Sequence, residues 1–408
     1  MEDYHDANRQ IEYIRQSLAQ DRNHTGFLLG AGCPLSIRID GAPLLPDIAG
    51  LTAEIKAKMA SKDAAKPSAY DRLCKLFAED GLPNFTIEDA LSMIRAMQQV
   101  VGKGEVRSFS SKELDDLDVS VCSIIANRMT ASLPNTKNAY HDLAIWARSL
   151  SREHPVHIFT TNYDMLIEEA FEEQGAPYFD GFTGSKKAFF DLNAVEEEGL
   201  ILARWTRLWK IHGSINWRAE LDSNGKMKAV VRSDTIVDGQ KYLIYPSHLK
   251  YDQSRKMPYL ALMDRMRAFL LSHNSILVTS GYSFGDEHIN DQIISGLQNN
   301  PSAIVYALLH ENLDTPAYSK AVDCGMTTPN LVVIAKDAGI IGRKRAYWRL
   351  RETSEFDGTF EELVKCLEEA TDENEGRLKC EVSVGDFAKL GLVLRSMCRP
   401  DVGVKSNE

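Results

Sequence analysis

Short apolar runs alternate with segments of helical periodicity along most of this chain, and this pattern predicts an α/β fold. Five runs have the length and the flanking turn residues of buried strands: 26–30, 156–160, 275–280, 303–309 and 331–335. Between them, apolar residues recur every three or four positions, as at Leu166 and Ala170. Strands that alternate with helices form parallel sheets with both faces covered. We therefore expect a doubly wound, Rossmann-like parallel sheet.

The order of these segments predicts one main domain and a small C-terminal unit. The main domain spans 1–335, and its residues 52–150 show helical periodicity without a strand-like run, which indicates a helical insertion. Residues 176–245 are rich in glycine, aromatic and β-branched residues, which is typical of a small mixed region that contains strands. From 336 to 408 a basic stretch precedes an acidic one, and we expect a C-terminal appendage there.

Composition and charge narrow the class of protein. The 408 residues are 44% hydrophobic and 26% charged, as in a globular protein with a large core, and the net charge is −11. This charge argues against broad nucleic-acid binding. We interpret the basic cluster at 343–351 as a solvated face, with contacts to nucleic acid or a partner as the alternatives. The first residues lack the features of a signal peptide, and no apolar run approaches about 18 residues, so we expect a cytoplasmic protein without a membrane span.

The seven cysteines are dispersed along the chain, and no two of them form a C-x-x-C pair. This distribution predicts reduced thiols and no disulfide framework. The spacing of zinc ligands is also missing, so we expect no metal site and no zinc.

The first apolar run breaks directly into the sequence Gly-Ala-Gly. Backbone N–H groups of such a turn can bind the pyrophosphate of a dinucleotide, which makes Gly30, Ala31 and Gly32 candidate binding residues. The alternative is a tight strand-to-helix connection without a ligand. Cys33 follows, and a packed, inert thiol is favoured over a reactive one at this position.

Polar residues follow two further segments. Asn162 and Asp164 come directly after the run at 156–160, where open α/β sheets bind ligands, although Asp164 could instead cap the next helix. His212 precedes a glycine that permits close approach of a ligand, and histidine can accept a proton at neutral pH. A satisfied core histidine is the alternative.

The runs at 275–280 and 303–309 also end in candidate binding residues. Gly281, Ser283 and Phe284 follow the first of them and can offer backbone amides and a hydroxyl to a phosphate or a ribose. Asp286 stands where a helix N-cap is expected. Glu311 follows the second run and could accept hydrogen bonds from ribose hydroxyls.

Four segments, taken in order, resemble the sirtuin family, and more closely its bacterial sirtuin-like branch found in antiphage defence operons. They are GFLLGAGCP at 26–34, TTNYD at 160–164, KIHGS at 210–214 and GYSFGD at 281–286. The resemblance implies that the Gly-Ala-Gly loop, including Cys33, holds the phosphates of NAD. It also implies that Asn162 and Asp164 line the nicotinamide pocket and that His212 is the catalytic histidine.

The resemblance further implies a role for Asp47 and an activity. Sirtuins carry a Pro-Asp-Phe-Arg element after the glycine loop, whereas Ile48 and Ala49 follow Asp47 here, which leaves Asp47 alone as a weak candidate on the nicotinamide side. Because the zinc-ligand cysteines of protein deacylases are missing, we expect an NAD+ hydrolase that uses NAD as its substrate. An NAD-dependent deacylase or ADP-ribosyltransferase and a non-catalytic NAD or ADP-ribose sensor are the alternatives. The branch also implies a homo-oligomer with a HerA-type ATPase partner, since this chain has no P-loop of its own.

Overall fold

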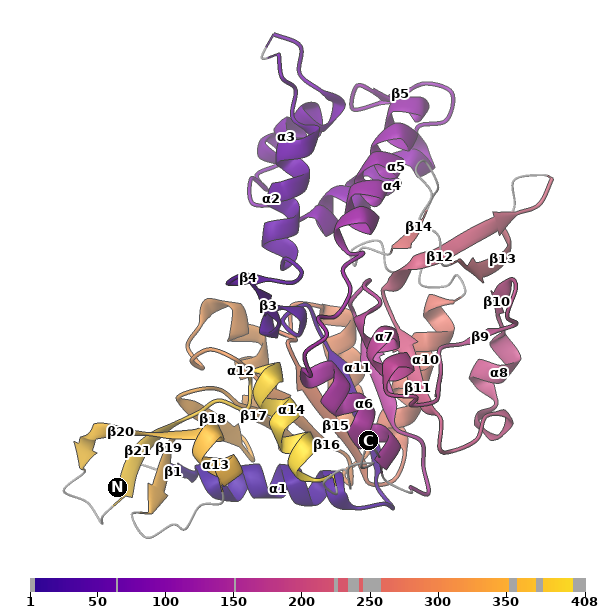
Figure 1. The fold of residues 1–408 in the computed structure, drawn as a ribbon. Coiled ribbons are helices and arrows are strands. Elements are labelled where there is room, and N and C mark those ends of the chain that lie inside the picture. The colour runs from indigo at the N-terminus through magenta and orange to yellow at the C-terminus, as the bar shows by residue number, and fades with distance from the viewer. Residues whose placement is uncertain are drawn as a thin grey trace, which may run out of the picture.

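A large central sheet organises the protein (Figure 1). The computed structural model describes residues 4–63, 65–149, 152–223, 227–233, 242–244, 258–351, 358–371 and 377–398. Within these residues, 12 strands join in one sheet. Seven of them are parallel neighbours, in the order β17 (Leu331–Ile334), β16 (Ile304–Leu308), β15 (Ser275–Ser280), β2 (His24–Leu29), β7 (His157–Thr160), β11 (Thr206–Lys210) and β8 (Tyr178–Phe179). The predicted doubly wound α/β fold is confirmed.

The order of the parallel strands creates a switch point beside β2. The chain passes from β2 to β7 on one side, and it returns later to place β15 on the other side of β2. The connections after β2 and β15 therefore leave the sheet in different directions, and open α/β sheets bind ligands at this place.

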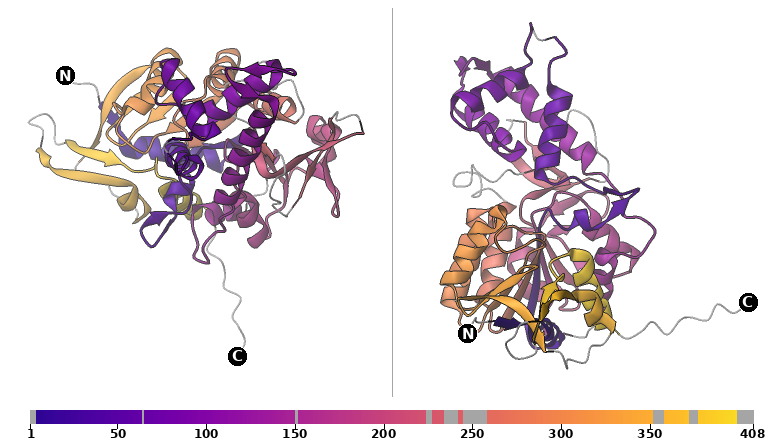
Figure 2. Two further views of the ribbon diagram at one scale, coloured as in Figure 1. Left: turned by 90° about the horizontal axis from the view of Figure 1, so that it is seen from above. Right: turned by 90° about the vertical axis from the view of Figure 1, so that its left-hand side faces the viewer.

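Strand alternation divides the core into two layers. Phe27 and Leu29 point into a cluster with α1 (Ala7–Ala19), while Leu28 between them points into the opposite cluster. Successive side chains of a strand lie on opposite faces, so both faces of this sheet are apolar and covered. Helices of the first layer are α1, α6 (Ala139–Ser149), α7 (Leu166–Glu173) and α14 (Phe387–Ser396), and those of the second are α10 (Tyr259–Leu271), α11 (Glu287–Asn299) and α12 (Ser319–Thr327) (Figure 2). The short helix α8 (Leu192–Glu196) packs on α10.

The C-terminal segment extends the same sheet. The extension is antiparallel and consists of β18 (Ala338–Ile341), β19 (Lys344–Arg351), β21 (Arg377–Val382) and β20 (Val364–Thr371), with β1 (Tyr4–Asp6) parallel to β19. The short helix α13 (Gly358–Leu363) precedes β20. The described part of the expected C-terminal appendage is thus continuous with the main sheet.

The last helix of the segment expected as a helical insertion, α6, packs against the sheet, and the preceding part of that segment stands over the carboxyl edge of the parallel strands (Figure 1). This preceding part contains α2 (Ile48–Met59), α3 (Ala69–Glu79), α4 (Ile87–Val100), α5 (Ser111–Arg128) and the hairpin of β5 (Glu105–Val106) and β6 (Phe109–Ser110). Thr86 and Asp89 form a capping box at the start of α4. No described helix has the length and apolarity needed to cross a membrane.

A second, five-stranded sheet follows β11. Its order is β14 (Tyr242–Ile244), β12 (Gly213–Leu221), β13 (Met227–Arg232), β10 (Ala188–Phe190) and β9 (Phe182–Thr183). The small hairpin of β3 (Arg38–Ile39) and β4 (Ala42–Pro43) and three short 3-10 turns complete the described elements: Pro34–Ser36, Glu198–Leu200 and Pro316–Tyr318.

Candidate active site

The two glycine loops pack directly on each other at the switch point. The Gly30 N–H donates to the Ser280 carbonyl, and the Gly32 N–H donates to the Gly281 carbonyl, both at 2.9 Å. A Cβ on Gly30 would lie 2.3 Å from the Gly281 oxygen, and one on Gly32 would lie 2.7 Å from the Gly281 Cα. These glycines are therefore needed for the contact between loops, and Gly281 also has a positive φ of 63°.

Two cavities meet at this pair of loops. The first has a volume of about 360 Å³ and is bordered by Asn162, Asp164 and His212. The second has a volume of about 630 Å³ and is bordered by Asp47 and Glu311. The two share the wall formed by Ala31, Ile48, Gly281, Tyr282 and Ser283. An elongated ligand that spans both cavities would cross the glycine loops at its middle.

The first cavity holds a buried histidine–carboxylate pair. His212 follows β11, and its Nε2 lies 3.1 Å from Oδ2 of Asp286, with about a tenth of either side chain exposed. The other Asp286 oxygen accepts the N–H groups of His288 and Ile289 at the start of α11. An ionised carboxylate only accepts hydrogen bonds, so Nε2 carries the proton and Nδ1 is the basic nitrogen of His212.

Asn162 is fixed at the end of β7. Its side-chain amide donates to the Gly30 carbonyl at 3.1 Å, and its backbone N–H donates to Oγ1 of Thr160 at 3.0 Å. The side chain is buried and borders the first cavity. The hydrogen bond to Gly30 holds the amide against the glycine loop and fixes its orientation.

Asp164 is a buried carboxyl group on the wall of this cavity. Its Oδ1 accepts the N–H of Leu166, the first residue of α7, at 3.1 Å, although the N-cap position of this helix is Met165. Burial raises the pKa of Asp164 to about 6, and the nearby charge of Lys210 limits this rise. Asp164 thus combines a hydrogen bond to the first turn of α7 with a position on the cavity wall.

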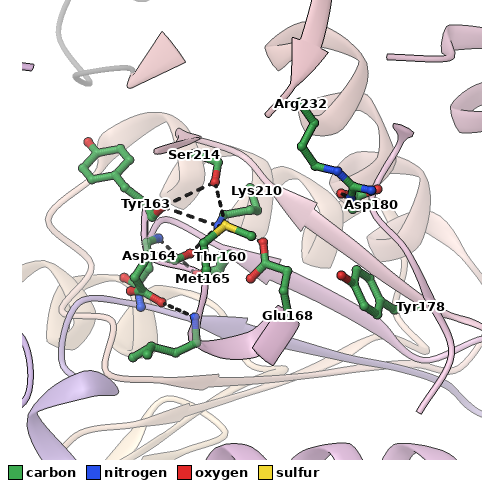
Figure 3. A network of polar contacts seen from close by, with 12 residues as sticks. Thr160, Tyr163, Asp164, Met165, Glu168, Tyr178, Asp180, Lys210, Ser214 and Arg232 are labelled. Atoms are coloured by element: carbon green, nitrogen blue, oxygen red, sulfur yellow. Dashed lines mark hydrogen bonds and ion pairs between the residues drawn. The ribbon is translucent and has the colours of Figure 1, made fainter. Parts of the chain in front are cut away.

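A buried lysine supports the loop that carries Asp164 (Figure 3). Lys210 ends β11, and its Nζ donates to the Asp164 carbonyl and, at 2.9 Å, to Oε1 of Glu168. Lys210 is 1% exposed and Glu168 is 3% exposed, so the two charges neutralise each other away from water. The ion pair connects the segment before His212 to the segment that contains Asn162 and Asp164.

The helical insertion forms part of the first cavity. Thr86, Glu88 and Asp89 from the start of α4 border it, and the Tyr163 hydroxyl donates to Glu88 at 2.9 Å. Sequence reasoning did not identify these residues as part of the site. The capping box at Thr86 marked the start of a helix but gave no sign of what that helix end faces.

The remaining predicted residues divide into two groups. Ser283, Asp47 and Glu311 border the second cavity. Cys33 and Phe284 are fully buried instead. The Cys33 thiol donates to the Ser280 carbonyl at 3.2 Å, and burial raises its pKa far above that of a reactive thiol, which agrees with the packed, inert interpretation.

The fold is that of an α/β protein with two adjoining cavities at the switch point of its parallel sheet. The sequence model of the SIR2-like domain family matches residues 156–323, which supports a sirtuin-like family and NAD-related chemistry. The matched residues include Asn162, Asp164, His212 and Gly281, whereas the Gly30 loop lies before them. No curated protein matches this chain. Among the described residues, no group of three or more His, Cys, Asp or Glu side chains is placed to hold a metal ion.

Proposed function

We propose that this protein is an NAD+ hydrolase that cleaves the bond between nicotinamide and ribose to give nicotinamide and ADP-ribose. The observation that carries the proposal is the pair of adjoining cavities, one of which contains the His212–Asp286 pair. The pyrophosphate would lie against the shared wall, with the nicotinamide riboside in the first cavity and adenosine in the second.

The first cavity has the groups that this reaction needs. Loss of nicotinamide leaves positive charge on the ribose, and the Asp164 carboxylate would stabilise that charge. Asn162 would hold the ribose or the attacking water. Nδ1 of His212 would accept the proton of that water or of a ribose hydroxyl, while Asp286 stabilises the imidazolium that forms.

The helical insertion favours water over a peptide as the acceptor. Glu88 and Met129 from this insertion border the same cavity as His212. These side chains would restrict the entry of an acylated peptide. Such a restriction would favour hydrolysis over deacylation or ADP-ribosyl transfer.

The test is release of nicotinamide from NAD+ by the purified protein, followed by chromatography and mass spectrometry. In ¹⁸O-labelled water, hydrolysis places one labelled oxygen on ADP-ribose. His212→Ala should abolish release, because one general base contributes about 100- to 10,000-fold. His273→Ala, at an exposed histidine that borders neither cavity, is the matched control.

Other results would replace the proposal. Nicotinamide release that requires an acylated peptide would identify a deacylase. NAD+ binding without release, unchanged in His212→Ala, would identify a sensor.

We also propose that the protein acts as the effector of a bacterial antiphage defence system, as a homo-oligomer with a HerA-type ATPase partner. The support is the order of the four motifs together with the missing P-loop. Size-exclusion chromatography with light scattering, with and without the product of a neighbouring ATPase gene, tests the assembly. A monomer that does not bind the ATPase would refute this part alone.

A further inference from the structure

A third cavity lies next to the first one and borders neither glycine loop. It has a volume of about 350 Å³, and α7, β12 and the segment that follows α5 contribute to its wall. Met129, directly after α5, borders both this cavity and the first one. The third cavity is therefore a neighbour of the candidate active site, and the proposed dinucleotide does not occupy it.

Two buried oxygen atoms on side chains that border the third cavity lack a hydrogen-bond donor. Lys210 donates to Oε1 of Glu168, whereas Oε2 of Glu168 accepts no hydrogen bond from any residue that the structure describes. Oδ1 of Asn216 likewise accepts none from the described part of the chain. Glu168 is 3% exposed and Asn216 is 7% exposed. Burying an acceptor without a donor is unfavourable, so these two oxygens indicate a ligand that donates hydrogen bonds.

The charge around the cavity indicates that this ligand is a cation. Glu169, Glu172 and Glu173 of α7 also border the cavity, and none of them forms an ion pair with a lysine or arginine that the structure describes. The cation on the cavity border is Arg232, which is paired with Asp180. The carboxylates of α7 therefore give the cavity an excess of negative charge.

The available oxygens favour an ammonium group over a guanidinium group or a metal ion. Because Lys210 already occupies one oxygen of Glu168, this carboxylate cannot offer the two free oxygens that a guanidinium binds best. No set of three or more His, Cys, Asp or Glu side chains in the described ranges is placed to hold a metal ion. An ammonium group donates three hydrogen bonds in separate directions, so it can bind single oxygens from different elements.

The spacing of the glutamates along α7 indicates a second ammonium group on the same ligand. Glu172 and Glu173 follow Glu168 and Glu169 by four residues, so the two pairs lie on one face of the helix and about 6 Å apart along its axis. The second pair is exposed, whereas Glu168 is buried. Met165 and Ile215 add apolar side chains to the border of the cavity, which suit a short hydrocarbon chain.

We propose that the third cavity binds an aliphatic diamine with two ammonium groups about 6 Å apart. One ammonium group donates to Oε2 of Glu168 and Oδ1 of Asn216. The other lies against the carboxylates of Glu172 and Glu173. Because Glu168 also binds Lys210, which supports the loop of Asp164, the site lies one ion pair away from the first cavity (Figure 3). The inference does not depend on the proposed function, since no step of NAD+ cleavage uses this cavity.

Isothermal titration calorimetry with two simple amines tests the inference on the full chain. 1,4-Diaminobutane should bind at one site with a dissociation constant on the order of 1 mM or lower. n-Butylamine has the same hydrocarbon chain with a single ammonium group, and it should bind at least about tenfold more weakly. Mg²⁺ at the same concentration as the diamine should not displace it.

Three variants assign the two ammonium positions. Glu168→Gln places an NH2 donor where Oε2 or Oε1 stands and should abolish binding of both amines. Asn216→Ala removes the unpartnered amide oxygen without breaking an ion pair, and it should weaken binding of both amines by about tenfold.

The double variant Glu172→Gln with Glu173→Gln should weaken binding of the diamine by about tenfold and leave that of n-butylamine nearly unchanged. Glutamine keeps an acceptor for the partners of these residues, Tyr178 and His141. Glu361→Gln with Glu362→Gln, at two exposed neighbours on α13 that do not border the cavity, removes the same charge and is the matched control.

Failure of 1,4-diaminobutane to bind would overturn the inference, as would equal affinities for the two amines or displacement by Mg²⁺. Unchanged binding in a folded Asn216→Ala protein would also overturn it. This variant decides the matter if Glu168→Gln does not fold, which can happen because the buried Lys210 loses a charged partner. Nicotinamide release is not part of the readout, so the hydrolase proposal and the diamine site fail or succeed separately.

Discussion

Replacement of Asp286 by asparagine separates its two roles, because the helix cap survives and the support of His212 does not. The Oδ1 position must accept the N–H groups of His288 and Ile289, so the carbonyl oxygen of the asparagine amide occupies it. The NH2 group is then placed where Oδ2 was, 3.1 Å from Nε2 of His212. A donor faces Nε2, which must become the acceptor and move its proton to Nδ1.

The expected effect on the rate follows from this change of tautomer. For Nδ1 of His212 to accept a proton, Nε2 must carry one. The Nε2–H of His212 and the NH2 group of the asparagine would then be two buried donors that face each other. Leaving a buried donor without a partner costs about 1–3 kcal/mol, so this arrangement costs about 3 kcal/mol or more. With about 1.4 kcal/mol for each factor of ten, kcat for nicotinamide release should fall by at least about 100-fold.

Initial rates over a range of NAD+ concentrations are the assay. The fall should appear in kcat, while KM and the affinity for ADP-ribose change little, because Asp286 acts through His212 and not through binding of the adenosine half. Asp6→Asn, at the N-cap of α1, is the matched control for loss of a capping carboxylate. A kcat within about tenfold of wild type, in a protein with an unchanged unfolding temperature, would refute the role of this pair.

Two further substitutions test the electrostatics of the first cavity. The pKa of Asp164 is higher in the folded chain than in the unfolded one, so the folded state loses stability as pH rises from about 4 to 6. Asp164→Asn should therefore raise the unfolding temperature at pH 7.5 but not at pH 4. The free energy of unfolding at pH 7.5 should increase by up to about 3 kcal/mol. The same substitution should slow nicotinamide release. An equal shift at both pH values would contradict this. Lys210→Met should lower the free energy of unfolding by about 3–5 kcal/mol, because Glu168 is left buried and unpaired. Adding Glu168→Leu to this variant should recover most of the lost stability. If the stability losses of the two single variants simply add in the double variant, the two side chains are not coupled.

The central strands were predictable because they are short, continuous apolar runs with both faces buried. The C-terminal strands were not, and β19 shows why. Ala346, Trp348 and Leu350 are buried, while Arg345 and Tyr347 between them are exposed. This alternation is typical of a strand with one solvated face, but the basic residues of the segment led to an interpretation based on charge alone. The interpretation as a solvated basic face therefore missed that the same residues form a strand.

The candidate site was predictable where each residue follows a parallel strand. Asn162 follows β7 and His212 follows β11, and the carboxyl ends of parallel strands lie at one edge of a sheet. The partner of His212 was not predictable in this way. Asp286 is distant in sequence and fits fully as a helix cap, so capping alone explained it. Contacts between separate loops, such as that of Tyr163 with Glu88, leave no periodic signal in the sequence.

The glycines of the two loops are explained by the fold alone, whereas the His212–Asp286 pair is not. Gly30, Gly32 and Gly281 are required by loop-to-loop contact, so a chain of this fold without any ligand would need the same glycines. Their presence cannot distinguish a dinucleotide site from a tight turn. The His212–Asp286 pair is different, because burying an imidazole against a carboxylate costs desolvation that an apolar pair would avoid. The case for catalysis therefore rests on this pair and on its position in the wall of the first cavity.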